Sequence, residues 1–164
     1  MSFSPELTST AAALLDGYRR NNLRIVTAES CTGGLIAACL TEIAGSSDVV
    51  ERGLVTYSNQ AKIELLGVPP ETLEKHGAVS PHAARAMVEG ALARSPADVA
   101  VAVTGIAGPG GATPAKPVGL VYLACQRRGR EPMIERHQFH GDRQAVRLAS
   151  LEAAFELLRQ EIDE

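Results

Sequence analysis

The segment DVAVAVTG, residues 98–105, is apolar at almost every position over the length of one β-strand. A strand with one face in water alternates apolar and polar side chains, whereas this segment carries apolar side chains on both faces. We therefore expect a central strand of a sheet that has helices packed on both sides. This favours a layered α/β fold.

Helix and strand patterns alternate along the rest of the chain. Serine or aspartate before an apolar periodic segment predicts a helix start, and glycine after such a segment predicts its end. The expected order is a helix from Ser4-Pro5, a strand at 23–28, a helix after Thr32 that Gly45 ends, a strand at 53–57, a helix from Ser58 to Gly67, a helix from Ser80-Pro81, the central strand, a hairpin of 118–126 with 133–139, and a helix capped by Asp142. This order predicts a three-layer α/β/α sandwich with a five-stranded mixed sheet, mostly parallel, in which the hairpin requires an antiparallel strand. The length of 164 residues predicts a single domain, 1–164.

Ligands of such sheets bind at the carboxyl ends of the parallel strands, which selects three segments: 29–34, 57–62 and 104–111. The first contains ESCTGG at a strand-to-helix turn. There the first amides of the helix are unpaired and can hold an anion or a developing oxyanion. The alternative is an ordinary helix start, capped by Thr32 and shaped by the two glycines.

Ser30 and Cys31 are both nucleophile candidates. A thiol is the stronger nucleophile, but it normally works with a histidine base, and none of the four histidines follows an expected parallel strand. The segment TYSNQAK offers Lys62 near the first turn of a helix at the same edge. Such a lysine is unfavourable when charged, so its pKa should fall, and a neutral amine can take a proton from serine. The alternatives are a structural Cys31 and a solvated surface lysine.

The third segment continues as a loop, TGIAGPGGATPAKPVG, with five glycines and three prolines over residues 104–119. Its glycines allow close approach to the backbone, and its prolines restrain it. It lacks the Gly-Lys-Ser/Thr ending of a Walker A loop, and it does not resemble a GxGxxG motif that opens a helix. We expect it to bind a ribose or a phosphate through its amides.

Composition argues against several classes of protein. A net charge of −3, 4% aromatic residues and no tryptophan argue against nucleic-acid binding, and the cluster RRGR at 127–130 is interpreted as a solvated hairpin tip. No apolar run could span a bilayer, and the first ten residues lack the apolar core of a signal peptide. Three cysteines without metal-type spacing fit a reduced cytoplasmic protein. We expect no metal, no cofactor and no membrane partner.

Six motifs occur together and in order: TAESCTGG, GLVTYSNQAKIELLGV, GAVSPHAARAM, AVTGIAGPGG, KPVGLVY and GDRQAVR. Through them the chain resembles the C-terminal domain of the competence/damage-inducible CinA family over about residues 7–158. The resemblance implies an anticodon-binding-domain-like sandwich. It also implies nicotinamide-nucleotide amidase activity, the hydrolysis of nicotinamide mononucleotide to nicotinate mononucleotide and ammonia in pyridine nucleotide salvage.

Many members carry an N-terminal pyrophosphatase domain similar to molybdopterin-binding proteins. Since this chain begins with the amidase-like domain, we expect that second activity to be absent.

Matched motif by motif, the resemblance makes Ser30 the nucleophile and Lys62 the active-site lysine, with Tyr57 beside them and Cys31 a packing neighbour. The candidates for the phosphate site are the glycine loop of residues 104–119 and the start of the last helix, where Arg143 could bind the phosphate with two hydrogen bonds. The expected substrate-binding residues are Cys31, Thr32, Gly33, Gly34, Asn59, Thr104, Gly105, Gly108, Gly110, Gly111 and Arg143. A homodimer is expected, as for many small α/β enzymes. The rival hypotheses are a non-catalytic nucleotide-binding regulatory module and a metal-dependent hydrolase, for which no ligand-spaced cluster is found.

Overall fold

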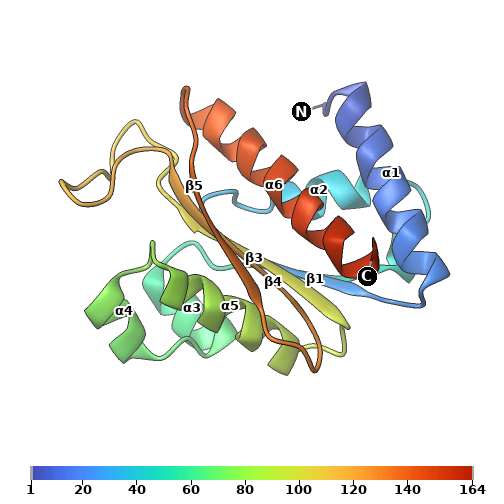
Figure 1. Cartoon of the computed structure of the whole chain (residues 1–164), viewed down its shortest axis with the longest axis horizontal. Helices are drawn as coiled ribbons and strands as arrows, with labels where there is room; N and C mark the ends of the chain where they lie inside the picture. Colours follow the sequence, from blue (N-terminus) through green and yellow to red (C-terminus); the bar gives the residue numbers. More distant parts are fainter. Residues whose placement is uncertain (1, 164) are drawn as a thin grey trace.

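A five-stranded sheet lies between two layers of helices in the computed structural model, which describes residues 2–163 (Figure 1). The elements in chain order are α1 (Pro5–Arg20), β1 (Ile25–Glu29), α2 (Leu35–Thr41), a 3-10 helix (Ser46–Asp48), β2 (Val50–Val55), α3 (Asn59–Leu66), α4 (Pro70–His76), α5 (Pro81–Ala93), β3 (Val99–Gly105), β4 (Leu120–Arg127), β5 (Met133–Gln138) and α6 (Arg143–Asp163). Helices α1, α2 and α6 cover one face of the sheet, and α3, α4 and α5 cover the other.

The strand order is β2-β1-β3-β4-β5, with β3 in the middle. Strand β1 pairs in parallel with both β2 and β3, while β4 is antiparallel to both β3 and β5. Four strands therefore run in one direction, and only β4 opposes them. The expected three-layer sandwich with a mixed, mostly parallel sheet is confirmed.

Strand β3 shows why its sequence has no polar face. Val99, Val101 and Val103 pack into the core beneath α1, α2 and α6. Ala100 and Ala102 alternate with them and pack into the core beneath α3, α4 and α5. All five side chains are fully buried, so β3 is covered on both faces as its composition predicts.

Several helix starts follow the predicted chemistry. The side chains of Ser4, Ser58 and Ser80 each accept a hydrogen bond from the backbone N–H three residues later. Asp142 does the same for the start of α6, where the Ala145 N–H donates to its Oδ1 at 2.9 Å. Gly67 ends α3 with a positive φ of 64°, a conformation that glycine adopts without strain.

Other elements differ from expectation. Helix α4 is absent from the sequence-based order; it begins at a Pro69-Pro70 pair and spans two turns, too short for a clear apolar period. Strand β2 begins at Val50, three residues before the expected start, in a segment whose charged residues obscure the strand pattern. The hairpin tip is not simply solvated, because Arg128 donates to the carbonyls of Leu92, in the last turn of α5, and of Ser95 and Ala97, which follow it.

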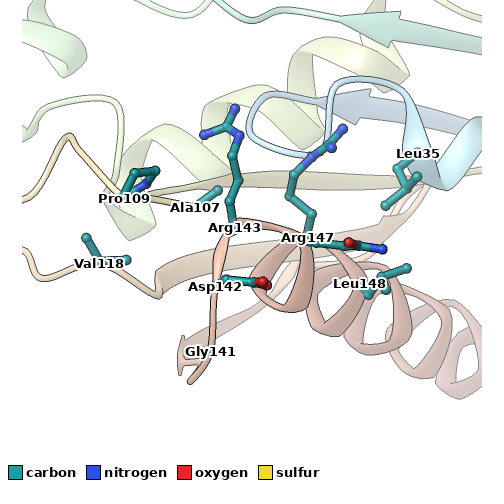
Figure 2. Close-up of a pocket in the computed structure, with 10 residues that line it drawn as sticks. Leu35, Ala107, Pro109, Val118, Gly141, Asp142, Arg143, Arg147 and Leu148 are labelled. Carbon is teal, nitrogen blue, oxygen red and sulfur yellow. The ribbon is translucent and has the colours of Figure 1, made fainter.

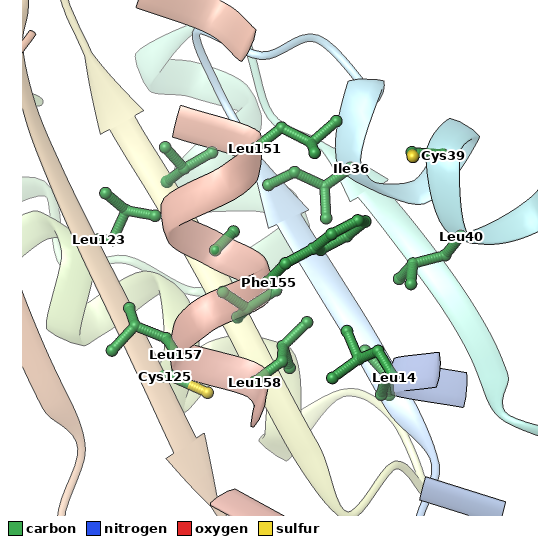
Figure 3. Close-up of a cluster of buried hydrophobic side chains, with 14 of the residues drawn as sticks. Leu14, Ile36, Cys39, Leu40, Leu123, Cys125, Leu151, Phe155, Leu157 and Leu158 are labelled. Carbon is green, nitrogen blue, oxygen red and sulfur yellow. The ribbon is translucent and has the colours of Figure 1, made fainter. Parts of the chain in front are cut away.

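Helix α6 is anchored along most of its length. Leu151, Phe155 and Leu158 face Leu14 of α1 and Ile36 of α2 in the larger core cluster (Figure 3). This packing fixes the first turn of α6 beside the carboxyl ends of β1 and β3, where its arginines reach the candidate site. Within residues 2–163, no helix combines the length and apolar character needed to cross a bilayer.

Candidate active site

The three segments selected from the sequence meet at one edge of the sheet. Strands β2, β1 and β3 are neighbours and parallel, so the turns that follow them lie side by side. They enclose a cavity of about 260 Å³, lined by Ser30, Cys31, Tyr57, Asn59, Lys62, Ala78, Val79, Thr104, Gly105, Ile106, Ala107, Gly108, Gly110, Gly111 and Arg143. Of the residues expected to form the site, only Thr32, Gly33 and Gly34 do not line this cavity.

Lys62 and Ser30 are in direct contact at the floor of the cavity. The Lys62 Nζ lies 2.8 Å from the Ser30 Oγ, and both side chains are buried. The same Nζ donates to the carbonyl oxygens of Thr56 at 2.9 Å and of Tyr57 at 3.4 Å. Helix α3 supplies the lysine, and the two residues that follow β2 supply the carbonyls, so the amine is held between a helix and the preceding turn.

These three partners suit both protonation states of the lysine. A neutral amine has two N–H bonds for the two carbonyls, and its lone pair can accept the hydroxyl proton of Ser30. An ammonium has three N–H bonds, which the same three oxygens can accept. Lys62 can therefore gain and lose a proton without changing its neighbours.

Burial lowers the pKa of Lys62 from its usual 10.5 to about 8. Within residues 2–163, no carboxylate lies within ion-pair distance of its Nζ to offset the loss of solvation. The expected direction of the shift is right. The sequence predicts that Ile63 and Leu65 bury this amine, but Leu65 is exposed. The amine is instead enclosed by residues that directly follow β1 and β2.

The turn after β1 leaves several amides free. The Ser30 N–H donates to the Val103 carbonyl, and the Gly33 N–H donates back to the Ser30 carbonyl. The N–H groups of Cys31, Thr32 and Gly34 have no oxygen acceptor among residues 2–163. Free amides beside a nucleophile can stabilise a developing oxyanion.

Cys31 is buried beside Ser30, and the loss of solvation raises the pKa of its thiol to about 11. A thiol in that range is protonated at neutral pH and is a poor nucleophile.

Glu29, the last residue of β1, was not expected among the site residues. Its buried carboxylate accepts three hydrogen bonds, from the Thr32 hydroxyl at 2.7 Å and from the N–H groups of Ile36 at 2.9 Å and Ala37 at 3.0 Å. Glu29 therefore caps α2 from the preceding strand. The alternative in which Thr32 caps this helix is wrong, since the N-cap is Gly34, with a φ of 101° and no side-chain bond.

Arg143 and Tyr57 lie at the mouth of the cavity. The Arg143 guanidinium donates to the Gly108 carbonyl at 2.8 Å and to the Tyr57 hydroxyl at 3.1 Å. It is exposed, and among residues 2–163 it is the one arginine that lines the cavity. Thr104, which also lines the cavity, donates to the Ala78 carbonyl and so fixes the segment that follows α4.

No described histidine lines the cavity, and within residues 2–163 no group of three or more His, Cys, Asp or Glu side chains could hold a metal ion. His76 and His82 stack on each other instead, and His137 pairs with Glu135 in β5. Lys62, with a pKa of about 8, is suited to act as a base near neutral pH.

A second cavity of about 870 Å³ adjoins the first, and Ala107 and Arg143 line both. Figure 2 shows Arg143 and Arg147 rising side by side from α6, one helical turn apart. Arg147 reaches the turn that carries Ser30 and was not expected from the sequence. Its spacing of four residues from Arg143 places it on the same helix face, which is a signal that could have found it.

A family model described as the CinA C-terminal domain matches residues 7–162. A CinA-like protein from Akkermansia muciniphila is 51% identical over 144 residues, which cover 88% of this chain and 35% of the relative. A CinA-like protein from Mycolicibacterium vanbaalenii is 50% identical over 158 residues, or 94% of this chain and 37% of the relative. The chain thus spans about a third of the length of the curated relatives it matches.

Solved structures agree with these matches. The competence/damage inducible protein CihA from Agrobacterium tumefaciens superposes with a TM-score of 0.95 at 48% identity, and the match covers 100% of both chains. A competence-damaged protein (CinA) superfamily protein from Escherichia coli has a TM-score of 0.90 at 33% identity, covering 98% of this chain and 94% of that one.

Proposed function

The chain belongs to the family of CinA C-terminal domains, and we propose that it is a nicotinamide-nucleotide amidase, which hydrolyses nicotinamide mononucleotide to nicotinate mononucleotide and ammonia. One observation carries this proposal. The Nζ of a buried lysine with a lowered pKa lies 2.8 Å from the hydroxyl of a buried serine at the floor of a cavity. Such a pair can act as a nucleophile and its base in amide hydrolysis.

In the first half-reaction, the Ser30 Oγ attacks the carboxamide carbon and gives its proton to the neutral amine of Lys62. The carbonyl oxygen becomes an oxyanion, for which the free turn amides are the available donors. The Lys62 ammonium then passes the proton to the departing nitrogen. The C–N bond breaks, ammonia leaves, and an acyl ester remains on Ser30.

In the second half-reaction, water attacks the ester carbon and gives a proton to Lys62. Lys62 returns that proton to the Ser30 Oγ as the ester C–O bond breaks, and nicotinate mononucleotide leaves. Both half-reactions use the same two side chains, which is consistent with a lysine whose three partners accept either protonation state.

The substrate phosphate needs a cation and amides at the cavity mouth. Arg143 supplies the cation, and it would exchange its neutral partners, Gly108 and Tyr57, for the phosphate oxygens. The glycine loop, through Gly108, Gly110 and Gly111, supplies exposed backbone at the same wall. We propose no metal or organic cofactor for the reaction. We also propose a cytoplasmic homodimer, because the three cysteines are free thiols and small α/β enzymes often pair.

The test is an ammonia-release assay on the purified protein, with nicotinamide mononucleotide, nicotinamide and the dinucleotide compared side by side. We expect turnover of the mononucleotide and little turnover of free nicotinamide, since remote binding energy is needed to orient the reacting carbon. Saturable binding of the mononucleotide without ammonia release would instead identify a non-catalytic nucleotide-binding module. Loss of ammonia release in the presence of a chelator would identify a metal-dependent hydrolase.

A further inference from the structure

We propose that Arg147 is a positioning residue that orients the oxyanion-binding turn after Ser30, an inference that rests on the proposed serine amidase. Its Nε donates to the Cys31 carbonyl at 3.2 Å, and its Nη2 donates to the Thr32 carbonyl at 3.0 Å. Within residues 2–163, no carboxylate forms an ion pair with this guanidinium. Arg147 thus binds two successive carbonyls of the turn after Ser30 rather than an acidic partner.

The geometry of the peptide bond links these carbonyls to the oxyanion donors. In a trans peptide, the C=O of one residue and the N–H of the next point in opposite directions. Holding the Cys31 carbonyl on Arg147 therefore directs the Thr32 N–H away from the guanidinium. This N–H is one of the turn amides that has no oxygen acceptor among residues 2–163. If this peptide flipped, a carbonyl oxygen would replace the donor and would repel a developing oxyanion.

Glu29 also contacts this turn. Its carboxylate accepts from the Thr32 hydroxyl and from two amides in the first turn of α2. A negative charge there offsets the positive end of the helix, which would otherwise favour an anion. The Arg147 guanidinium restores a positive charge beside the turn, and it polarises the two peptide groups whose carbonyls it binds.

The second cavity provides a way to test this role. Arg147 lines that cavity together with Leu35, Ala107 and Leu148 (Figure 2). Removal of its side chain would leave a gap that opens into about 870 Å³ of accessible space. A free guanidinium ion can enter such a gap and bind the two carbonyls in place of the missing side chain.

The experiment compares the wild type with Arg147→Ala, with Arg159→Ala as the matched control. Arg159 is also on α6, but it is exposed and pairs only with Glu156 and Asp163 among the described residues. Loss of one oxyanion donor reduces kcat by about 10²–10³-fold, so we expect Arg147→Ala to lose kcat by at least about tenfold, with KM nearly unchanged. Arg159→Ala should match the wild type.

Guanidinium chloride at a concentration well below denaturation should restore part of the lost kcat of Arg147→Ala, while sodium chloride at equal ionic strength should not. A merely structural role would lower the melting temperature, and guanidinium would not rescue the activity. An unchanged kcat, or a loss that guanidinium does not relieve, would overturn the proposal.

A second readout separates this inference from the choice of substrate. A fluorophosphonate labels an activated serine: the Ser30 Oγ attacks phosphorus, the P–F bond breaks, fluoride leaves, and Lys62 takes the hydroxyl proton. The developing negative charge on the phosphoryl oxygen needs the same turn amides. We expect slower labelling of Arg147→Ala and its rescue by guanidinium, even if nicotinamide mononucleotide is not turned over. Equal labelling rates would overturn the role of Arg147, whereas normal labelling without ammonia release would overturn only the amidase.

Discussion

At the scale of single residues, the chemistry of Lys62 follows from the position of its amine. Its stem leaves α3, and its Nζ ends among two carbonyls and one hydroxyl, away from solvent and from any described carboxylate. Desolvation therefore acts on the charged form without an opposing ion pair, and it lowers the pKa to about 8. A lysine in this range is partly neutral at physiological pH.

The pH dependence of the reaction should report this lysine. Because only the neutral amine accepts the Ser30 proton, kcat/KM should rise about tenfold per pH unit below the pKa and level off above about 8. Lys62→Arg should lose about 10²–10⁴-fold of kcat, almost as much as Lys62→Ala, since guanidinium cannot give up its proton. Initial rates across a pH series that brackets this pKa measure both effects. Substantial turnover by Lys62→Arg would show that Lys62 contributes its charge and not proton transfer.

The adjacent nucleophile candidates can be separated by substitution. Ser30→Ala should abolish turnover, because no other described hydroxyl is paired with the Lys62 amine. Cys31→Ala should keep most of its turnover, because a buried thiol with a pKa of about 11 is not ionised. The measurement is kcat for each folded variant, with circular dichroism as the check on folding. An active Ser30→Ala beside an inactive Cys31→Ala would reverse the assignment.

Arg143 should determine which nicotinamide compounds are turned over. Arg143→Ala should raise KM for nicotinamide mononucleotide by about 10–100-fold, the value of a charged hydrogen-bond pair to phosphate. The slow hydrolysis of free nicotinamide, which has no phosphate, should not change. Arg136→Ala, at an exposed position of β5 away from the cavity, serves as the control. Parallel effects on both substrates would place the phosphate elsewhere.

At the scale of elements, the junction between β1 and α2 depends on Glu29. Both carboxylate oxygens of Glu29 accept hydrogen bonds. In the variant Glu29→Gln, one of these oxygens is replaced by an NH₂ group, which is a donor and would face another donor. Glu29→Gln should therefore destabilise the fold by about 1–3 kcal/mol, with a fall in Tm of several degrees. Thermal unfolding measures this change. Thr41→Val, which removes only the contacts of an exposed hydroxyl with the carbonyls of Ala37 and Ala38 at the end of α2, should have a much smaller effect.

The same junction shows what could be predicted from the sequence. Local signals were sufficient where a cap lies next to its own helix, as at Ser58 and Ser80, and where an apolar period is long, as in β3. The start of α2 has no such local cap, because its cap comes from the preceding strand across a turn of glycines. Proximity in the sequence therefore predicts Thr32 as the cap, whereas in the folded chain Glu29 caps the helix.

The site was predictable to a similar degree. The rule that ligands bind at the carboxyl ends of parallel strands is sufficient to bring Ser30, Lys62 and the glycine loop together. The four-residue spacing from Arg143 indicates that Arg147 lies on the same face of α6, but its contact with Cys31 joins residues 116 positions apart and is not encoded by that spacing. Such contacts are set by the packing of α6 onto the sheet.

At the scale of the whole molecule, the active-site lysine should have a cost in stability. Folding buries an amine whose pKa falls from 10.5 to about 8, so the unfolded state binds this proton more tightly. Below about pH 8 both states hold the proton and the full penalty applies. Between about pH 8 and 10.5 the unfolded chain still holds a proton that the folded chain has lost, so the cost of burying a charged lysine decreases across this range. Within the window, the free energy of unfolding changes with pH by the difference in bound protons.

The sign of that change follows from the linkage relation. Stability rises with pH wherever the unfolded state binds more protons than the folded state, as it does here between the two pKa values. The contribution of Lys62 is therefore least favourable at neutral pH and improves as pH rises through the window. Above the unfolded pKa both states have lost the proton, and the charge penalty is gone.

Lys62→Met should therefore be more stable than the wild type at neutral pH, by on the order of 2 kcal/mol, and inactive. The gain should shrink between about pH 8 and 10.5, as the wild-type penalty disappears. Urea unfolding at several pH values measures the difference between the two proteins. Lys75→Met, at an exposed position of α4, controls for the loss of a surface charge. A gain that did not vary with pH would mean that packing, not protonation, sets the cost.

The reach of α6 back to the turn after β1 also matters while the chain is being made. Translation proceeds from the N-terminus, so Ser30 and Lys62 leave the ribosome well before Arg143 and Arg147. A nascent chain that ends before α6 carries the serine and its lysine, but neither the guanidinium that holds the turn nor the one that closes the cavity mouth. The turn that carries the nucleophile is therefore completed only after α6, which begins 81 residues after Lys62, has been synthesised and has packed. Chains that end before α6 should not form an acyl ester on Ser30.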